Sequence, residues 1–125
     1  MGYKYAIYID DDEEDLEIFS TVIQEFSDEI SCLPFTSASK ALKKIISHEL
    51  APEIVFVDLN MHGMDGFEFL TEIRKQSDIT MPVIVLSTCS QPETIAKVEK
   101  LGADGFITKP SSIKEFVRLL TPYFG

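Results

Sequence analysis

Short apolar runs alternate along the chain with segments in which apolar residues recur every three or four positions. Residues 5–9, 54–58 and 83–87 are apolar almost throughout, which is typical of parallel strands buried on both faces. Two shorter strands are predicted at residues 30–35 and 105–108. This alternation indicates an α/β fold, with a parallel sheet and helices on both of its faces.

Local signals indicate where the intervening helices begin and end. The apolar stripes of the five predicted helices cover residues 16–26, 38–46, 67–73, 95–101 and 113–120. Capping signals stand at Ser37, at Asp65 with Glu68, at Ser90 with Glu93 around Pro92, and at Gly102. Pro34 lacks an N–H group and therefore predicts that the second strand lies at a sheet edge. The five strand–helix units fill the sequence, so we expect one domain over residues 1–125 without an effector domain.

Composition narrows the classes of function. The 125 residues include 11 basic and 21 acidic residues, a net charge of −10, which disfavours direct binding to nucleic acids and to anionic membranes. No apolar run approaches the roughly 18 residues of a membrane span, and no secretory signal is visible, so we expect a cytoplasmic protein. Cys32 and Cys89 show no metal or redox spacing and are predicted to be unpaired thiols.

Residues that carry chemistry follow the predicted strands: Asp10 and Asp11, Asp58, Ser87, and Lys109. Because the carboxyl ends of parallel strands meet at one edge of a sheet, we expect these side chains to converge there. Two carboxylates about 4 Å apart repel each other by about 4 kcal/mol at an effective dielectric near 20. A bound cation would offset this repulsion, and Mg²⁺ prefers oxygen ligands of this kind.

An aspartate can act as a nucleophile in phosphoryl transfer, which depends mainly on in-line positioning and charge neutralisation. A metal ion, the Lys109 ammonium and the Ser87 hydroxyl can each hold one phosphoryl oxygen. The sequence therefore predicts that Asp58 accepts a phosphoryl group.

Together these motifs resemble the receiver domain of bacterial response regulators, of which the chemotaxis receiver is a single-domain example. The resemblance covers nearly the whole chain and rests on residues 9–11, 58–61, 63–66, 87–88, 102–103 and 109–110. It implies a doubly wound, flavodoxin-like (βα)5 fold whose five parallel strands have the order 2-1-3-4-5, which agrees with the edge position that Pro34 predicts. It also implies a cis peptide bond before Pro110.

The resemblance implies a Mg²⁺-dependent reaction, with Mn²⁺ as an alternative ion. Asp58 would be phosphorylated by a histidine kinase or a phosphotransfer protein, and Lys109 would pair with the phosphoryl group. Asp11 would bind the metal directly, and Asp10 would act through water. The Asp58 carboxylate and the backbone carbonyl of Asn60 would complete the protein ligands.

The resemblance further implies a switch. Ser87 would move to donate a hydrogen bond to the phosphoryl group, and Phe106 would turn inward in the active state. A face formed by the fourth helix, fifth strand and fifth helix would then bind a downstream protein target. The expected function is a stand-alone receiver in a phosphorelay, whose only chemistry is its own phosphorylation and dephosphorylation. A homodimer that forms through the fourth and fifth helices is a further alternative.

Two alternative functions remain at this stage. The chain could be a constitutive interaction module that is never phosphorylated. It could also be a phosphatase that uses Asp10 and Asp12 as nucleophile and acid, a spacing that resembles haloacid-dehalogenase hydrolases, although those enzymes normally have longer chains.

Several residues keep two interpretations. His62 stands where receivers usually have proline, and it is either a solvated loop residue or a group that reaches the metal or the phosphoryl group. Cys89 either influences how long the phosphoryl group persists or is a simple loop thiol. The acids at residues 12–15 are expected to form a helix start and a solvated face, and His48 to favour a helix dipole.

Overall fold

A five-stranded parallel sheet forms the middle layer of the computed structural model, which describes residues 2–125. The strands are β1 (Tyr5–Ile9), β2 (Ser31–Phe35), β3 (Ile54–Asp58), β4 (Val83–Ser87) and β5 (Gly105–Thr108). Their spatial order is β2-β1-β3-β4-β5, which confirms the predicted fold class and strand order. Pro34 lies in β2 at the edge of the sheet, as its missing N–H predicted.

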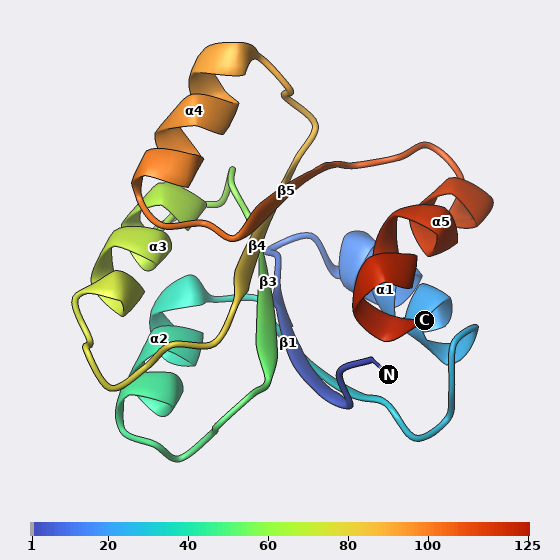
Figure 1. Ribbon diagram of the computed structural model, residues 1–125, viewed down its shortest axis with the longest axis horizontal. Coiled ribbons are helices and arrows are strands. Elements are labelled where there is room, and N and C mark those ends of the chain that lie inside the picture. The colour runs from blue at the N-terminus through green and yellow to red at the C-terminus, as the bar shows by residue number, and fades with distance from the viewer. Residues whose placement is uncertain (1) are drawn as a thin grey trace.

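Five helices cover the two faces of the sheet. They are α1 (Glu13–Gln24), α2 (Ala38–Ile46), α3 (Gly66–Arg74), α4 (Pro92–Lys100) and α5 (Ile113–Phe124). Helices α1 and α5 lie on one face, and α2, α3 and α4 lie on the other (Figure 1). No helix within residues 2–125 combines the length and apolar character needed to cross a membrane.

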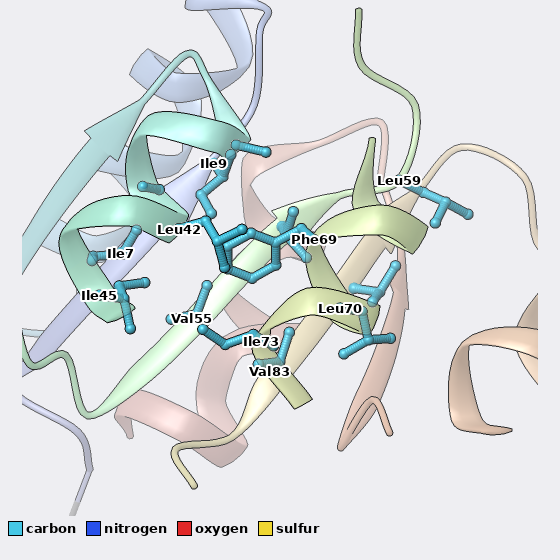
Figure 2. Close-up of a cluster of buried hydrophobic side chains, with 14 of the residues drawn as sticks. Ile7, Ile9, Leu42, Ile45, Val55, Leu59, Phe69, Leu70, Ile73 and Val83 are labelled. Atoms are coloured by element: carbon cyan, nitrogen blue, oxygen red, sulfur yellow. The ribbon is translucent and has the colours of Figure 1, made fainter. Parts of the chain in front are cut away.

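The strands bury side chains on both faces, which explains their continuous apolar runs. In β1, Ile7 and Ile9 pack into the core beneath α2 and α3 (Figure 2). The alternate residues Ala6 and Tyr8 pack into the second core, beneath α1 and α5. Because both layers are anchored to the same strands, the carboxyl ends of β1 and β3 are held rigidly side by side.

The helix ends confirm most of the predicted capping signals. The signals at Ser37, at Asp65 with Glu68, and at Gly102 are all confirmed. The capping box predicted at Ser90 is wrong, because α4 begins after Gln91, whose side chain makes no capping hydrogen bond. Pro92 occupies the first turn of α4 and has no N–H group, so one fewer donor needs a partner there.

The peptide bond between Lys109 and Pro110 is trans, since residues 2–125 contain no cis peptide bond. The predicted cis bond is therefore wrong, and the chain keeps the isomer that is intrinsically favoured even before proline. The backbone N–H of Lys109 donates to the Ser87 carbonyl at 2.9 Å, which ties the end of β5 to the end of β4.

Candidate functional site

Three carboxylates converge at the carboxyl edge of the sheet. Asp58 is the last residue of β3 and is only 5% exposed, and Asp10, directly after β1, is fully buried. Asp11 is partly exposed beside them. Each of the three offers an oxygen that lies within 4.8 Å of the others. The structure thus brings together the acids that the strand ends predicted.

Lys109 supplies the positive charge of the site from the end of β5. Its Nζ lies 2.9 Å from Asp10 Oδ2, 3.1 Å from Asp58 Oδ1 and 2.8 Å from Asp15 Oδ2. Burial by itself would lower the pKa of the ammonium, but hydrogen bonds to Asp15 and Asp10 and the charges of Asp10 and Asp58 outweigh burial and raise it. Lys109 is therefore a fixed cation in contact with the predicted acceptor.

The surroundings of Asp58 disfavour its charge. The pKa of its carboxyl is raised to about 6: burial raises it most, the charges of Asp10 and Asp11 add to the rise, and Lys109 acts in the opposite direction. Asp58 is mostly ionised at neutral pH, yet its negative charge is poorly solvated. Any added positive charge at this edge would relieve that penalty.

Asp10 is held by three donors of the protein. The Tyr8 hydroxyl donates to Oδ2 at 2.6 Å, Lys109 Nζ contacts the same oxygen, and the Asp12 N–H donates to Oδ1 at 3.0 Å. Burial, followed by the hydrogen bond to Asp10, raises the pKa of Tyr8, so its hydroxyl stays a donor. A carboxylate offers about four acceptor positions, so Asp10 keeps roughly one for a further partner.

Asp11 is clamped by His62. Asp11 Oδ2 accepts a hydrogen bond from the His62 backbone N–H at 2.9 Å and lies 3.1 Å from the ring Nδ1. The backbone hydrogen bond is the main reason that the pKa of the Asp11 carboxyl is lowered. The His62 side chain is exposed, as one interpretation expected, but it also contacts the acid cluster. Asn60, the predicted carbonyl ligand, lines the same shallow hollow beside Asp11.

The predicted switch residues lie on β4 and β5. Ser87 is fully buried, and its Oγ accepts a hydrogen bond from the Cys89 N–H at 3.0 Å. Phe106 is half-buried on β5 and lines a groove together with Lys109, Arg118 and Leu119. Lys109 therefore borders both the acid cluster and this groove.

Two residues that contact the site are not identified by the sequence patterns described above. The acidic run predicts a solvated face at Asp15, but this residue shares the inward stripe of α1 with Phe19 and Val22, four and seven residues further on. The apolar run predicts only a core role for Tyr8, although it lies two positions before Asp10 in an extended segment and thus on the same side of the sheet. Helical and strand periodicity, applied to these two positions, places both on the side of the site but does not identify the contacts.

Other residues singled out in the sequence lie apart from the acid cluster. His48 follows α2 with a φ of 64°, and its Nε2 lies 2.9 Å from Asp78 Oδ2. Cys32 and Cys89 are free thiols, as predicted. Burial raises the pKa of the Cys32 thiol to about 12, which keeps it protonated.

The acid cluster fits a divalent cation. Its donors are hard carboxylate oxygens close enough to share one ion, and a cation would relieve the desolvated charge of Asp58. Asp10, with most of its acceptor positions already used, suits an indirect role through water.

The fold and this site place the chain among receiver domains. Residues 6–121 match the response regulator receiver domain, and the chain belongs to this family of two-component signalling proteins. Divalent metal binding at the acidic pocket is a property of the family, and most of its members are regulators rather than enzymes.

Individual relatives agree with this assignment. The nisin biosynthesis regulatory protein NisR of Lactococcus lactis subsp. lactis is 30% identical over 117 residues, which cover 94% of this chain and 48% of NisR. The two-component response regulator ARR10 of Arabidopsis thaliana is 32% identical over 110 residues, 88% of this chain and 19% of ARR10. The chain spans about half the length, or less, of the curated relatives it matches.

Solved structures share the fold. The chemotaxis response regulator CheY4 of Vibrio cholerae superimposes with a TM-score of 0.80 at 24% identity, covering 94% of this chain and 95% of CheY4. The Mn²⁺-bound form of response regulator Rcp1 gives a TM-score of 0.81 at 20% identity, covering 94% and 90%.

Proposed function

We propose that Asp58 accepts a phosphoryl group from a histidine kinase or a phosphotransfer protein, and that this reaction switches a partner-binding face. The observation that carries the proposal is the contact of buried Asp58 with Lys109 beside two further carboxylates. This arrangement combines a nucleophilic oxygen, a fixed cation and a set of metal ligands, which are the groups that phosphoryl transfer needs.

An oxygen of the Asp58 carboxylate attacks the phosphorus of a phosphohistidine whose second ring nitrogen is protonated. The P–O bond forms, the P–N bond breaks, and the leaving nitrogen keeps the electron pair, so that a neutral imidazole departs. Lys109 pairs with a phosphoryl oxygen during this step. In dephosphorylation, water attacks the phosphorus and loses a proton to solvent, inorganic phosphate leaves, and the Asp58 carboxylate is regenerated.

The proposed metal is Mg²⁺, with Mn²⁺ as an alternative. Asp11, Asp58 and the backbone carbonyl of Asn60 would hold it, with Asp10 acting through water. When bound, the ion supplies positive charge toward the phosphoryl oxygens. The chain's own contribution is orientation: His62 fixes Asp11, and Tyr8 fixes Asp10.

The proposed switch connects Asp58 with the face formed by α4, β5 and α5. The Ser87 hydroxyl now accepts from the Cys89 N–H, and it keeps its own hydrogen to donate to a phosphoryl oxygen. Phe106 is half-buried, lines the groove and packs against the core beneath α2 and α3, and we expect this packing to change when the edge moves. A downstream protein target would bind this face.

A phosphatase using Asp10 and Asp12 is less well supported by the contacts. The Asp12 carboxylate caps α1 by accepting hydrogen bonds from the Glu14 and Asp15 N–H groups. These hydrogen bonds explain the presence of Asp12 by its structural role, and we therefore favour the receiver function.

Labelling by acetyl phosphate tests the proposal. We expect the protein with Mg²⁺ to gain one phosphoryl group in intact-protein mass spectrometry, and Asp58→Asn to gain none. Asp28→Asn, which alters an exposed acid before β2, is the matched control and should be labelled like the original protein. Equal labelling of Asp58→Asn and the original protein would contradict the proposal. Absence of labelling of the original protein would also contradict it and would favour a constitutive interaction module.

A further inference from the structure

We infer that Asp15 is a positioning residue that tethers Lys109 in the unphosphorylated domain and competes with the phosphoryl group for it. The inference rests on the proposed function and adds to it a residue that limits how readily Asp58 is phosphorylated. Asp15 belongs to the first turn of α1, far along the chain from Lys109, and its Oδ2 accepts a hydrogen bond from Lys109 Nζ at 2.8 Å.

Two carboxylates set the direction of the Lys109 ammonium. Nζ donates hydrogen bonds to Asp10 and Asp15, whereas its contact with Asp58, at 3.1 Å, is an ion pair. A lysine ammonium has three N–H donors, so the tether to Asp15 takes one of them and holds Nζ toward α1. Release of Asp15 would free that donor for a phosphoryl oxygen on Asp58.

The exposed fractions of the three carboxylate side chains indicate which partner Lys109 releases most easily. The side chain of Asp10 is 0% exposed and that of Asp58 is 8% exposed, whereas that of Asp15 is 34% exposed. Removing the cation from buried Asp10 would leave a buried charge unpaired, which is costly. Asp58 carries the phosphoryl group itself. Water can hydrate Asp15 after release, so Asp15 is the partner that gives way.

Asp15 therefore opposes phosphorylation in two ways. It holds an ammonium hydrogen that a phosphoryl oxygen could otherwise accept, and its own negative charge repels an anion bound at Asp58. Asp15→Asn removes the charge and weakens the tether, while Lys109 keeps Asp10 and Asp58. The variant should bind a phosphoryl analogue more tightly than the original protein does.

Beryllium fluoride with Mg²⁺ is a suitable equilibrium probe, because it mimics a phosphoryl group on aspartate without a covalent step. Its apparent Kd can be measured from amide chemical shifts in an NMR titration. The Asp15→Asn variant should show an apparent Kd about two- to fivefold lower, the range expected for a partly exposed ion pair. Glu14→Gln removes the same charge from an exposed side chain in the same helical turn and should leave the Kd close to that of the original protein.

The two variants distinguish the local effect of Asp15 on Lys109 and the bound anion from an effect of net charge or of structure alone. A lower Kd for Asp15→Asn than for Glu14→Gln supports the inference. Equal affinities of the two variants, or a lower unfolding free energy of Asp15→Asn with unchanged affinity, would overturn it, because Asp15 would then act through net charge or structure alone. Absence of binding by the original protein would instead refute the proposed function, and Asp58→Asn provides the background for that comparison.

Discussion

At the residue scale, the surroundings of Asp58 disfavour the ionised form of its carboxyl. Its pKa is raised from an ordinary 3.8 to about 6, mainly by burial and further by the charges of Asp10 and Asp11, and Lys109 offsets part of the rise. A raised carboxyl pKa means that the folded state binds the proton more tightly than the unfolded state does. Asp58 therefore contributes most to stability below about pH 4 and loses that contribution as the pH rises through about 6.

This titration predicts that Asp58→Asn stabilises the metal-free domain. Asparagine stays neutral, so the variant should unfold with about 1–3 kcal/mol more free energy than the original protein at pH 7.5. The difference should vanish near pH 4. Urea denaturation in EDTA, followed by circular dichroism at both pH values, measures it. Mg²⁺ should reduce the difference at pH 7.5, and a variant less stable than the original protein there would contradict the pKa assignment.

The same scale separates what the sequence could predict of the site from what it could not. Asp10, Asp58 and Lys109 were predictable because parallel strands carry whatever follows them to one edge. The contact between His62 and Asp11 depends on the conformation of a loop, which no periodicity describes. It also depends on a backbone N–H that a proline at position 62 would not have.

At the element scale, the start of α3 supports the acceptor. Gly66 is the first residue of α3, and its N–H donates to the Leu59 carbonyl at 3.1 Å. A Cβ at Gly66 would come within 2.8 Å of the Asp58 carbonyl oxygen and of Leu59 Cα, both of which are backbone atoms. The glycine therefore allows the helix to approach the end of β3 closely.

We expect Gly66→Ala to displace the acceptor strand. The clash should lower the unfolding free energy by about 1–3 kcal/mol, the usual cost of overpacking, and slow labelling by acetyl phosphate. Urea denaturation and mass spectrometry provide the two measurements. Gly63→Asn is the control, since Gly63 has a φ of 71°, which asparagine tolerates, and open space around its Cβ position. Unchanged stability and labelling of Gly66→Ala would show that the strand end is not held in this way.

The elements themselves were largely predictable. Continuous apolar runs predicted β1, β3 and β4 because both faces of each strand are buried. The start of α4 was not predicted correctly, because Ser90 and Pro92 suit two adjacent starting points equally well in sequence. Local chemistry identified the helix but did not fix its first residue.

At the scale of the whole molecule, the site and the groove share one residue. Lys109 contacts Asp58 on one side and lines the groove with Phe106 on the other. We therefore expect a change in the partners of Lys109 to alter the groove at the proposed partner-binding face. This short connection requires no long pathway through the core.

Because the chain is strongly acidic, we expect metal binding to affect the stability of the fold. The net charge is −10, and folding brings Asp58 beside Asp10 and Asp11, which lie far from it in the sequence. Mg²⁺ that binds only this native cluster should raise the unfolding free energy by about 1.4 kcal/mol at ten times its Kd. Thermal and urea denaturation across a Mg²⁺ titration would measure the increase, with NaCl at matched ionic strength as the reference for general screening.

A matched pair of variants assigns that stabilisation to the site. Asp11→Asn removes a proposed ligand and should abolish most of the Mg²⁺ effect, whereas Asp28→Asn removes an equal charge from an exposed loop and should keep it. An equal response to NaCl, or full stabilisation of Asp11→Asn by Mg²⁺, would mean that the ion only screens the acidic surface. The specific outcome would instead show that a bound cation offsets the burial and the carboxylate repulsion that together raise the pKa of Asp58.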